Sequence, residues 1–270
     1  MNDPDRALVE RAQRGDSAAL DELLARHEQQ VYRFGLRMCG NVEDAREILQ
    51  ETLLSAFRHL PGFRGDAQLS TWLYQIARSF CIKLRRPSGD VRGDEGLDHA
   101  AREIPEPGAL PDAQVHARQI GEALAAALRI LPAEQREVLI LRDVEGLSAE
   151  EAAKVVGIEV GALKSRLHRA RLELRGHLAT LLGESGSDTS EPPCPELLST
   201  LSAYVGKEVD QATCIDIERH LAGCARCAGA CEALQRTVSL CRRIPGDEVP
   251  PAVRLAVRHA LQAALTTPTR

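Results

Sequence analysis

The chain has 270 residues, of which 27% are charged and 3% aromatic, and its formal net charge is -5. The scarcity of aromatic residues favours helices over sheets, because β-branched and aromatic side chains usually fill a pleated surface. The absence of any long apolar run and a charged N-terminal sequence, MNDPDRALVERAQRGD, argue against a membrane or exported protein, so we expect a cytoplasmic one.

Helical periodicity and two polar linkers divide the chain into three blocks. Apolar residues recur at spacings near three and four in the first block, as in Leu20, Leu23 and Leu24. The stretches between the blocks are rich in Pro, Gly, Ser and acids, which is typical of tethers. The predicted organisation is a first domain at 5–86, an acidic linker at 87–114, a second domain at 115–182, a linker at 183–193 and a third domain at 194–266.

In the first block, DAREILQETLLSAF predicts an amphipathic helix. Its apolar stripe contains Ile48, Leu49, Leu53 and Phe57. Its polar face is either solvated or binds a basic partner surface. That face consists of Asp44, Glu47, Gln50 and Glu51.

The next helix, LSTWLYQIARSF, combines aromatic and basic side chains. Trp72, Tyr74 and Phe80 lie close in sequence to Arg78 and Lys83. Aromatic rings beside cations suit single-stranded DNA, because unpaired bases can stack on the rings while the cations bind the backbone. The alternative is a plain hydrophobic core, and for Trp72 burial is the better reading.

The second block has the layout of a helix-turn-helix, in GLSAEEAAKVVGIEVGALKSRLHRARLELRGHL. Ser148 is a good N-cap and Glu151 can complete a capping box. Gly157 can take the left-handed conformation of the turn. The second helix then begins near Val160 and turns its apolar face inward, through Leu163, Leu167, Ala170 and Leu174.

The other face of that second helix is basic, although the chain is acidic overall. Early residues of a recognition helix enter the major groove, so Lys164, Ser165 and Arg166 are expected at base edges. Later arginines, Arg169 and Arg171, are expected near phosphates. A solvated basic face on a structural helix is the alternative, but the cap, the turn and the charge together favour DNA binding.

The third block holds six of the eight cysteines. Thiols stay reduced in the cytoplasm, so such cysteines indicate metal or redox chemistry before disulfides. In HLAGCARC, the side chains of His220 and Cys224 share a helix face, and Cys227 completes a C-x2-C pair. With Cys194 upstream, they form a Cys3His set, which suits tetrahedral zinc.

Three further cysteines, Cys214, Cys231 and Cys241, exceed what a closed structural site needs. Surplus soft ligands suit a site that exchanges zinc, copper or cadmium. They equally suit a thiol switch that oxidises and releases the ion. Metal sensing is our first reading, redox sensing the second and a purely structural zinc the third.

Residues 41–86 resemble conserved region 2 of the extracytoplasmic-function (ECF, group 4) RNA polymerase sigma factors, and 131–178 resemble their region 4. The third block resembles the zinc-binding anti-sigma domain, here fused in cis. The resemblance implies an all-α, multidomain protein that binds core RNA polymerase and promoter DNA. The polar face of 44–57 would bind the β′ clamp and region 4 the −35 element, and the β flap of the polymerase is a further expected partner.

For the −10 element, the resemblance implies that the loop GFRGDAQ captures a flipped base, with Phe63, Arg64 and Asp66 near it. Trp72, Tyr74 and Arg78 would complete that surface. The chain has Ser79 and Lys83 where the family often has Asn and Asp, which affects the −10 preference and not the fold.

The function expected is therefore promoter-specific transcription initiation, regulated by the cysteine-rich domain, with no enzyme activity. A helix-turn-helix regulator that acts without polymerase is one rival. A thiol oxidoreductase is another, but its C-x2-C motif is expected beside a βαβ pattern, which the sequence does not show. The last helix, PPAVRLAVRHALQAAL, is expected to pack within its own domain rather than on region 2 or region 4.

Overall fold

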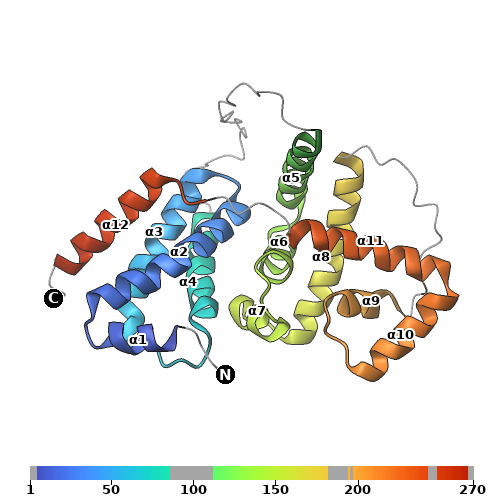
Figure 1. Ribbon diagram of the computed structural model, residues 1–270, viewed down its shortest axis with the longest axis horizontal. Coiled ribbons are helices and arrows are strands. Elements are labelled where there is room, and N and C mark those ends of the chain that lie inside the picture. The colour runs from blue at the N-terminus through green and yellow to red at the C-terminus, as the bar shows by residue number, and fades with distance from the viewer. Residues whose placement is uncertain (1–4, 86–111, 182–193, 195–196, 243–247, 267–270) are drawn as a thin grey trace.

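The computed structural model describes residues 5–85, 112–181, 194, 197–242 and 248–266. Every regular element in these ranges is helical, as Figure 1 shows. The predicted all-α fold is confirmed. No helix in these ranges is long and apolar enough to cross a bilayer.

The first bundle is built from residues 5–85. Asp16 begins its second helix by accepting a hydrogen bond from the Ala19 amide at 3.0 Å, and Asn41 caps the third by accepting from the Asp44 amide at 2.8 Å. Gly40, with φ of 83°, ends the helix between them. The elements are α1 (Arg6–Gln13), α2 (Ser17–Cys39), α3 (Val42–His59), the 3₁₀ turn η1 (Leu60–Gly62) and α4 (Leu69–Arg85).

Close packing of α2 on α3 forms the centre of this bundle. Phe34, Ile48 and Leu49 are fully buried there. A Cβ on Gly35 would lie 3.3 Å from Cγ2 of Ile48, so glycine allows the two helices to approach. The apolar stripe predicted for α3 therefore faces the core.

The second bundle contains the predicted helix-turn-helix. Ser148 and Glu151 form the predicted capping box, and Gly157 has φ of 77°, so both local predictions are confirmed. Leu163, Leu167 and Leu174 are buried, as the pattern of the second helix predicts. The elements are α5 (Asp112–Ile130), α6 (Ala133–Leu139), the π-helical turn η2 (Ile140–Val144), α7 (Ala149–Val156) and α8 (Val160–Leu181).

Three helices of the cysteine-rich block form a small module beside the second bundle. They are α9 (Leu198–Val205), α10 (Gln211–Gly223) and α11 (Ala225–Arg242). Leu201, Ile217 and Leu234 fill its core together with Cys227 and Cys231. The module packs on α8 and η2, at the right of Figure 1.

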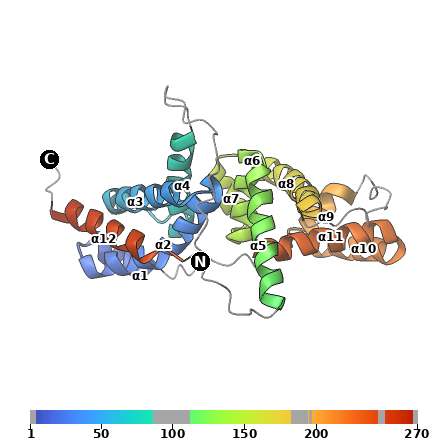
Figure 2. The same ribbon diagram turned by 90° about the horizontal axis from the view of Figure 1, so that it is seen from above.

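The last helix, α12 (Pro251–Thr266), lies on the opposite side of the molecule, against the first bundle (Figures 1 and 2). Val257 and Leu261 line a cavity of about 260 Å³ with Leu24 and Leu53. The expectation that this helix packs within its own domain is wrong. Its apolar stripe joins the core of the first bundle, whereas α9 to α11 enclose a separate small core.

Candidate functional sites

The structure brings together the four predicted metal ligands. One ligand atom from each of Cys194, His220, Cys224 and Cys227 lies within 4.8 Å of the other three. Tetrahedral zinc with Zn–S bonds of about 2.3 Å separates neighbouring sulfurs by about 3.8 Å. Small movements would therefore close the cluster around an ion.

The local chemistry of the cluster fits a metal. Nε2 of His220 is buried and has no hydrogen-bond partner, so it is free to bind an ion. The Cys194 amide donates to Sγ of Cys227 at 3.4 Å, which suits a thiolate. Hydrogen bonds from the Cys227 amide and from neighbouring ligands lower the pKa of Cys224 from 9.0 to about 6, whereas burial raises the pKa of Cys227.

The three surplus cysteines lie outside this cluster. Cys231 is buried in the core of the module, one turn beyond Cys227. Sγ of Cys214 lies 3.4 Å from Oε1 of Glu218. Desolvation is the larger cause, and the Glu218 carboxylate the smaller, of a raised pKa of the Cys214 thiol. Cys241 is buried in the larger core, where desolvation raises its pKa strongly. Among the described residues, the metal-ligand group consists of the other four.

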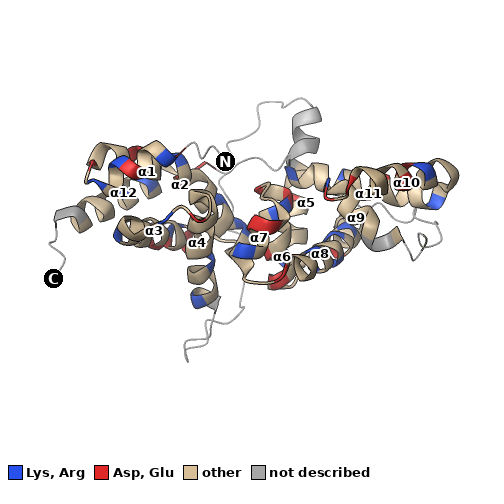
Figure 3. Cartoon of the chain, turned by 90° about the horizontal axis from the view of Figure 1, so that it is seen from below, with Lys and Arg blue, Asp and Glu red and all other residues tan. Residues whose placement is uncertain are grey.

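The five predicted −35 residues lie on α8, and four of them are accessible to differing degrees. Ser165 and Arg169 are exposed, whereas Lys164 and Arg166 are partly buried. Nη2 of Arg166 lies 3.4 Å from Oε2 of Glu134. Figure 3 shows basic residues along α8 and both signs of charge on α7.

Arg171 departs from the prediction of a phosphate contact, because its side chain is only 1% exposed. Its guanidinium donates to both carboxylate oxygens of Asp143 and, through Nη1, to the carbonyl and hydroxyl oxygens of Ser202. The expectation that it belongs to the exposed basic face is wrong in this structure. Arg171 lies on the face of α8 turned toward η2 and α9, where its cation neutralises the buried carboxylate of Asp143.

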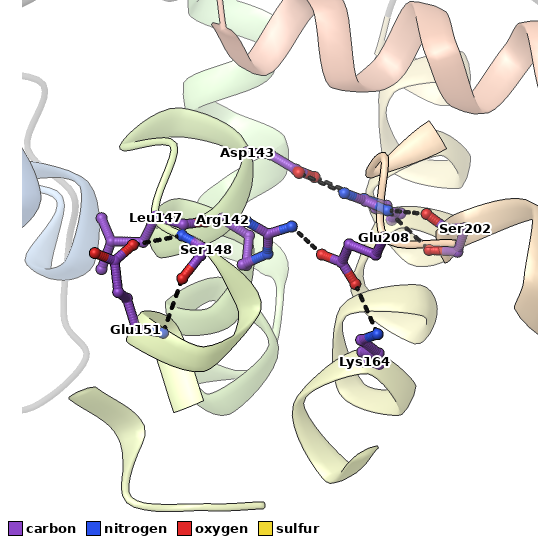
Figure 4. Close-up of polar contacts among 9 residues, drawn as sticks. Arg142, Asp143, Leu147, Ser148, Glu151, Lys164, Ser202 and Glu208 are labelled. Carbon is purple, nitrogen blue, oxygen red and sulfur yellow. Dashed lines mark hydrogen bonds and ion pairs between the residues drawn. The ribbon is translucent and has the colours of Figure 1, made fainter. Parts of the chain in front are cut away.

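One acid of the cysteine-rich module reaches α8 directly (Figure 4). Glu208 follows α9, pairs with the guanidinium of Arg142, and places Oε2 at 3.6 Å from Nζ of Lys164. Arg142 also donates to the Leu147 carbonyl. Burial lowers the pKa of Arg142, and the Glu208 side chain is 11% exposed, so this contact is largely shielded from water.

The turn before Glu208 explains its position. Lys207 has φ of 57°, a left-handed conformation that residues other than glycine adopt infrequently. The Lys207 amide donates to the Tyr204 carbonyl and the Glu208 amide to the Ala203 carbonyl, which closes the end of α9. Nothing in the sequence marks Glu208 as a contact, since the tertiary approach of α9 to α8 creates it.

The predicted −10 surface divides into an exposed and a covered part. Arg64 and Asp66 are exposed, and the rings of Phe63 and Trp72 contact each other with centroids 4.9 Å apart and planes tilted by 36°. Tyr74 is 2% exposed, and its hydroxyl donates to Glu145 at 2.8 Å. Arg78 pairs with Glu137. In this arrangement Tyr74 and Arg78 face the second bundle instead of an open DNA surface, which is a correction to their predicted placement.

The predicted polymerase-binding residues follow the polar side of α3. Glu47 is exposed, and Asp44, Gln50 and Glu51 are partly buried. Asp44 also accepts from the side-chain amide of Asn41 at 2.8 Å. Leu53, three residues after Gln50 and therefore close to its face, is covered where α12 packs on α3.

Three family models match separate parts of the chain. Sigma-70 region 2 matches residues 23–89, sigma-70 region 4 matches 121–174, and a putative zinc-finger family matches 194–228. The two sigma regions therefore coincide with the two bundles, and the zinc-finger match contains all four clustered ligands.

Named relatives agree with this assignment. The chain is 35% identical over 193 residues to the RNA polymerase sigma-H factor of Pseudomonas aeruginosa, covering 67% of this chain and 97% of the relative. It is 36% identical to the ECF RNA polymerase sigma factor SigE of Mycolicibacterium smegmatis, over 61% of this chain and 65% of the relative. It is 30% identical to SigW of Bacillus subtilis, over 64% and 96%. The chain belongs to the ECF RNA polymerase sigma factors, which direct promoter-specific transcription initiation.

Proposed function

We propose that this sigma factor is regulated in cis by its C-terminal segment, and that Cys194, His220, Cys224 and Cys227 bind zinc. The segment restrains the sigma regions, and a change in metal occupancy alters that restraint. The observation that carries the proposal is the contact of Glu208 with Lys164 and Arg142, because it joins the cysteine-rich module to the recognition helix.

A carboxylate at this position competes with DNA for the same cation. Lys164, Ser165, Arg166 and Arg169 are our candidates for −35 contacts, and phosphate oxygens would bind them as Glu208 binds Lys164. The same module packs along α8 and lines a cavity with Lys164 and Ser165. Access of duplex DNA to this face therefore requires the module to move.

The metal site has a direct mechanical connection to Glu208. Glu208 occupies the turn between α9 and α10, and α10 carries His220 near its end. Because the module's core is small, ligand bonds supply much of the energy that holds α9, α10 and α11 together. Loss or exchange of the ion would loosen that turn and change how firmly Glu208 binds α8.

The C-terminal segment also covers region 2. In our proposal Asp44, Glu47, Gln50 and Glu51 bind the β′ clamp, while the exposed loop with Phe63, Arg64 and Asp66 serves the −10 element. Arg254 of α12 pairs with Glu28 at 2.5 Å, and the Val249 amide donates to Gln29 at 3.2 Å. These contacts support a segment that touches both halves of the sigma factor.

Metal analysis of the purified protein, combined with transcription by reconstituted polymerase, tests the proposal. Cys224→Ser should remove close to one equivalent of zinc and change transcript yield in a metal-dependent way. Cys214→Ser is the matched control, because its sulfur lies outside the ligand group, and it should retain the metal. A protein that holds no metal, or transcription unchanged by Cys224→Ser, would refute the metal-dependent restraint.

A thiol switch is the second candidate, and the lowered pKa of Cys224 favours it. The thiolate form is the one that oxidants attack. Peroxide treatment of the zinc-loaded protein separates the two candidates. Zinc release with a disulfide detected by mass spectrometry supports the switch, whereas retention of zinc supports a response to metal alone.

A further inference from the structure

One buried carboxylate joins the two sigma regions. The Glu145 side chain, just after η2 in region 4, is 1% exposed. It accepts a bidentate pair from Arg33 of α2, with Nε at 2.7 Å from Oε1, and a hydrogen bond from the Tyr74 hydroxyl at 2.8 Å. Both carboxylate oxygens are therefore bound by groups of region 2, which leaves Glu145 fully satisfied.

A second acid of region 4 repeats this pattern. Glu137 of α6 pairs with Arg78 of α4, and the side chain of Gln75 donates to the Lys154 carbonyl at 3.0 Å. Tyr74, Gln75 and Arg78 follow one another within about one turn of α4. One face of that helix is thus occupied by region 4, and Figure 1 shows α4 beside α6 and α7.

The charges across this contact have a consistent direction. Region 2 supplies the guanidinium groups of Arg33 and Arg78 with the Tyr74 hydroxyl, and region 4 supplies the carboxylates of Glu137 and Glu145. Guanidinium and hydroxyl groups are also the donors that bind DNA phosphates. The acids of region 4 therefore bind donors of the kind that also bind phosphate oxygens.

We propose that region 4 closes over the −10 face of region 2, with Glu145 and Glu137 in place of promoter phosphates, so that Tyr74 and Arg78 reach DNA only when the two regions separate. This closure involves no residue of the cysteine-rich module, so it forms a second restraint. It rests on the −10 roles that the family resemblance implies for Tyr74 and Arg78.

The contact between region 2 and region 4 can open without leaving a charged side chain buried and unpaired. The side chains of Arg33 and Arg78 are 25% and 26% exposed, so each already touches water at the edge of the interface. Separation would hydrate both arginines and both acids, which removes most of the penalty for breaking a buried ion pair. Polymerase or DNA that binds the open form then shifts the population toward it.

The test compares full-length Glu145→Gln with the unaltered protein in two measurements. Hydrogen exchange of peptides spanning 72–80 and 140–147 reports closure. Fluorescence anisotropy with a labelled single-stranded oligonucleotide of random sequence reports access to the face. We expect exchange and apparent affinity each to rise about tenfold, because apparent affinity scales with the open fraction.

Two further variants keep the result interpretable. Glu150→Gln removes the same charge from an exposed position in α7 and should leave both readings unchanged. Arg33→Glu combined with Glu145→Arg reverses the pair and should restore slow exchange and weak binding. Unchanged exchange in Glu145→Gln, or faster exchange without tighter oligonucleotide binding, overturns the proposal. Failure of the proposed metal regulation would instead appear as transcription that does not change with zinc or with Cys224→Ser.

Discussion

Arg171 and Asp143 form a bidentate ion pair, with Nη2 at 2.6 Å from Oδ1 and Nε at 2.8 Å from Oδ2. Their side chains are 1% and 2% exposed. The pair lies where α8, η2 and α9 meet, because Arg171 also donates to Ser202. A residue of α8, where DNA contacts were predicted, therefore serves as a structural bridge to the cysteine-rich module.

Replacing Arg171 with Leu should destabilise the protein strongly. The substitution leaves Asp143 buried without a cation, which typically costs about 3–5 kcal/mol. Urea unfolding followed by circular dichroism would measure the loss. Arg169→Leu, at an exposed position of the same helix, should change the free energy of unfolding by less than about 0.5 kcal/mol. Equal effects of the two variants would contradict the bridging role.

Replacing Glu208 with Gln should strengthen binding of duplex DNA. The change frees Lys164 and weakens the hold of the module on α8, and one additional phosphate contact is worth roughly 1 kcal/mol, or about fivefold. Filter binding at two salt concentrations would measure it. Glu232→Gln on the exposed side of α11 serves as the control. Unaltered affinity in Glu208→Gln would show that the ion pair does not restrict α8.

Replacing Val257 with Asp should detach α12 from region 2. Val257 is 2% exposed, and a carboxylate there would face Leu24 and Leu53 without a partner. Limited proteolysis should then cut α12 first while the first bundle stays folded, and core polymerase should bind more tightly if α12 obstructs α3. Leu255→Asp is the matched control, since Leu255 is 57% exposed. Identical digestion of both variants would argue against the docked helix.

Thiol reactivity should separate the cysteines by pH. Because the pKa of Cys224 is lowered to about 6, this group is mainly thiolate at neutral pH in the metal-free protein. Its alkylation by iodoacetamide should rise through pH 6 and then level off. Burial raises the pKa of Cys241, so Cys241 should react only after unfolding. Mass spectrometry of alkylated peptides gives both rates, and comparable reaction of Cys241 in the folded protein would contradict its burial.

Local features of the sequence predicted the second bundle closely. The Ser148–Glu151 capping box and the left-handed turn at Gly157 are each formed by residues no more than four positions apart, so the local sequence is enough to predict them. The grouping of the four candidate metal ligands was also predictable, because His220, Cys224 and Cys227 are near neighbours and only Cys194 comes from farther away.

Interactions between distant elements were not predictable. Arg171 has the same basic character as Arg169 in the sequence. Only the approach of η2 and α9 makes it a buried ion-pair partner of Asp143. The position of α12 follows from complementarity with α2 and α3, far away in sequence. Tyr74 and Arg78 likewise look like open DNA contacts until region 4 supplies Glu145 and Glu137.

The docking of α12 and α9 on opposite halves of the same chain has a consequence for dosage. A separate inhibitor acts according to its concentration relative to its target, so its effect changes with the expression of either protein. A covalently attached one is present at a constant ratio of one to one, and its local concentration reaches the millimolar range for short flexible connections. In our proposal, the response of this regulator therefore tracks the chemical state of its cysteines and is insensitive to how many copies the cell makes.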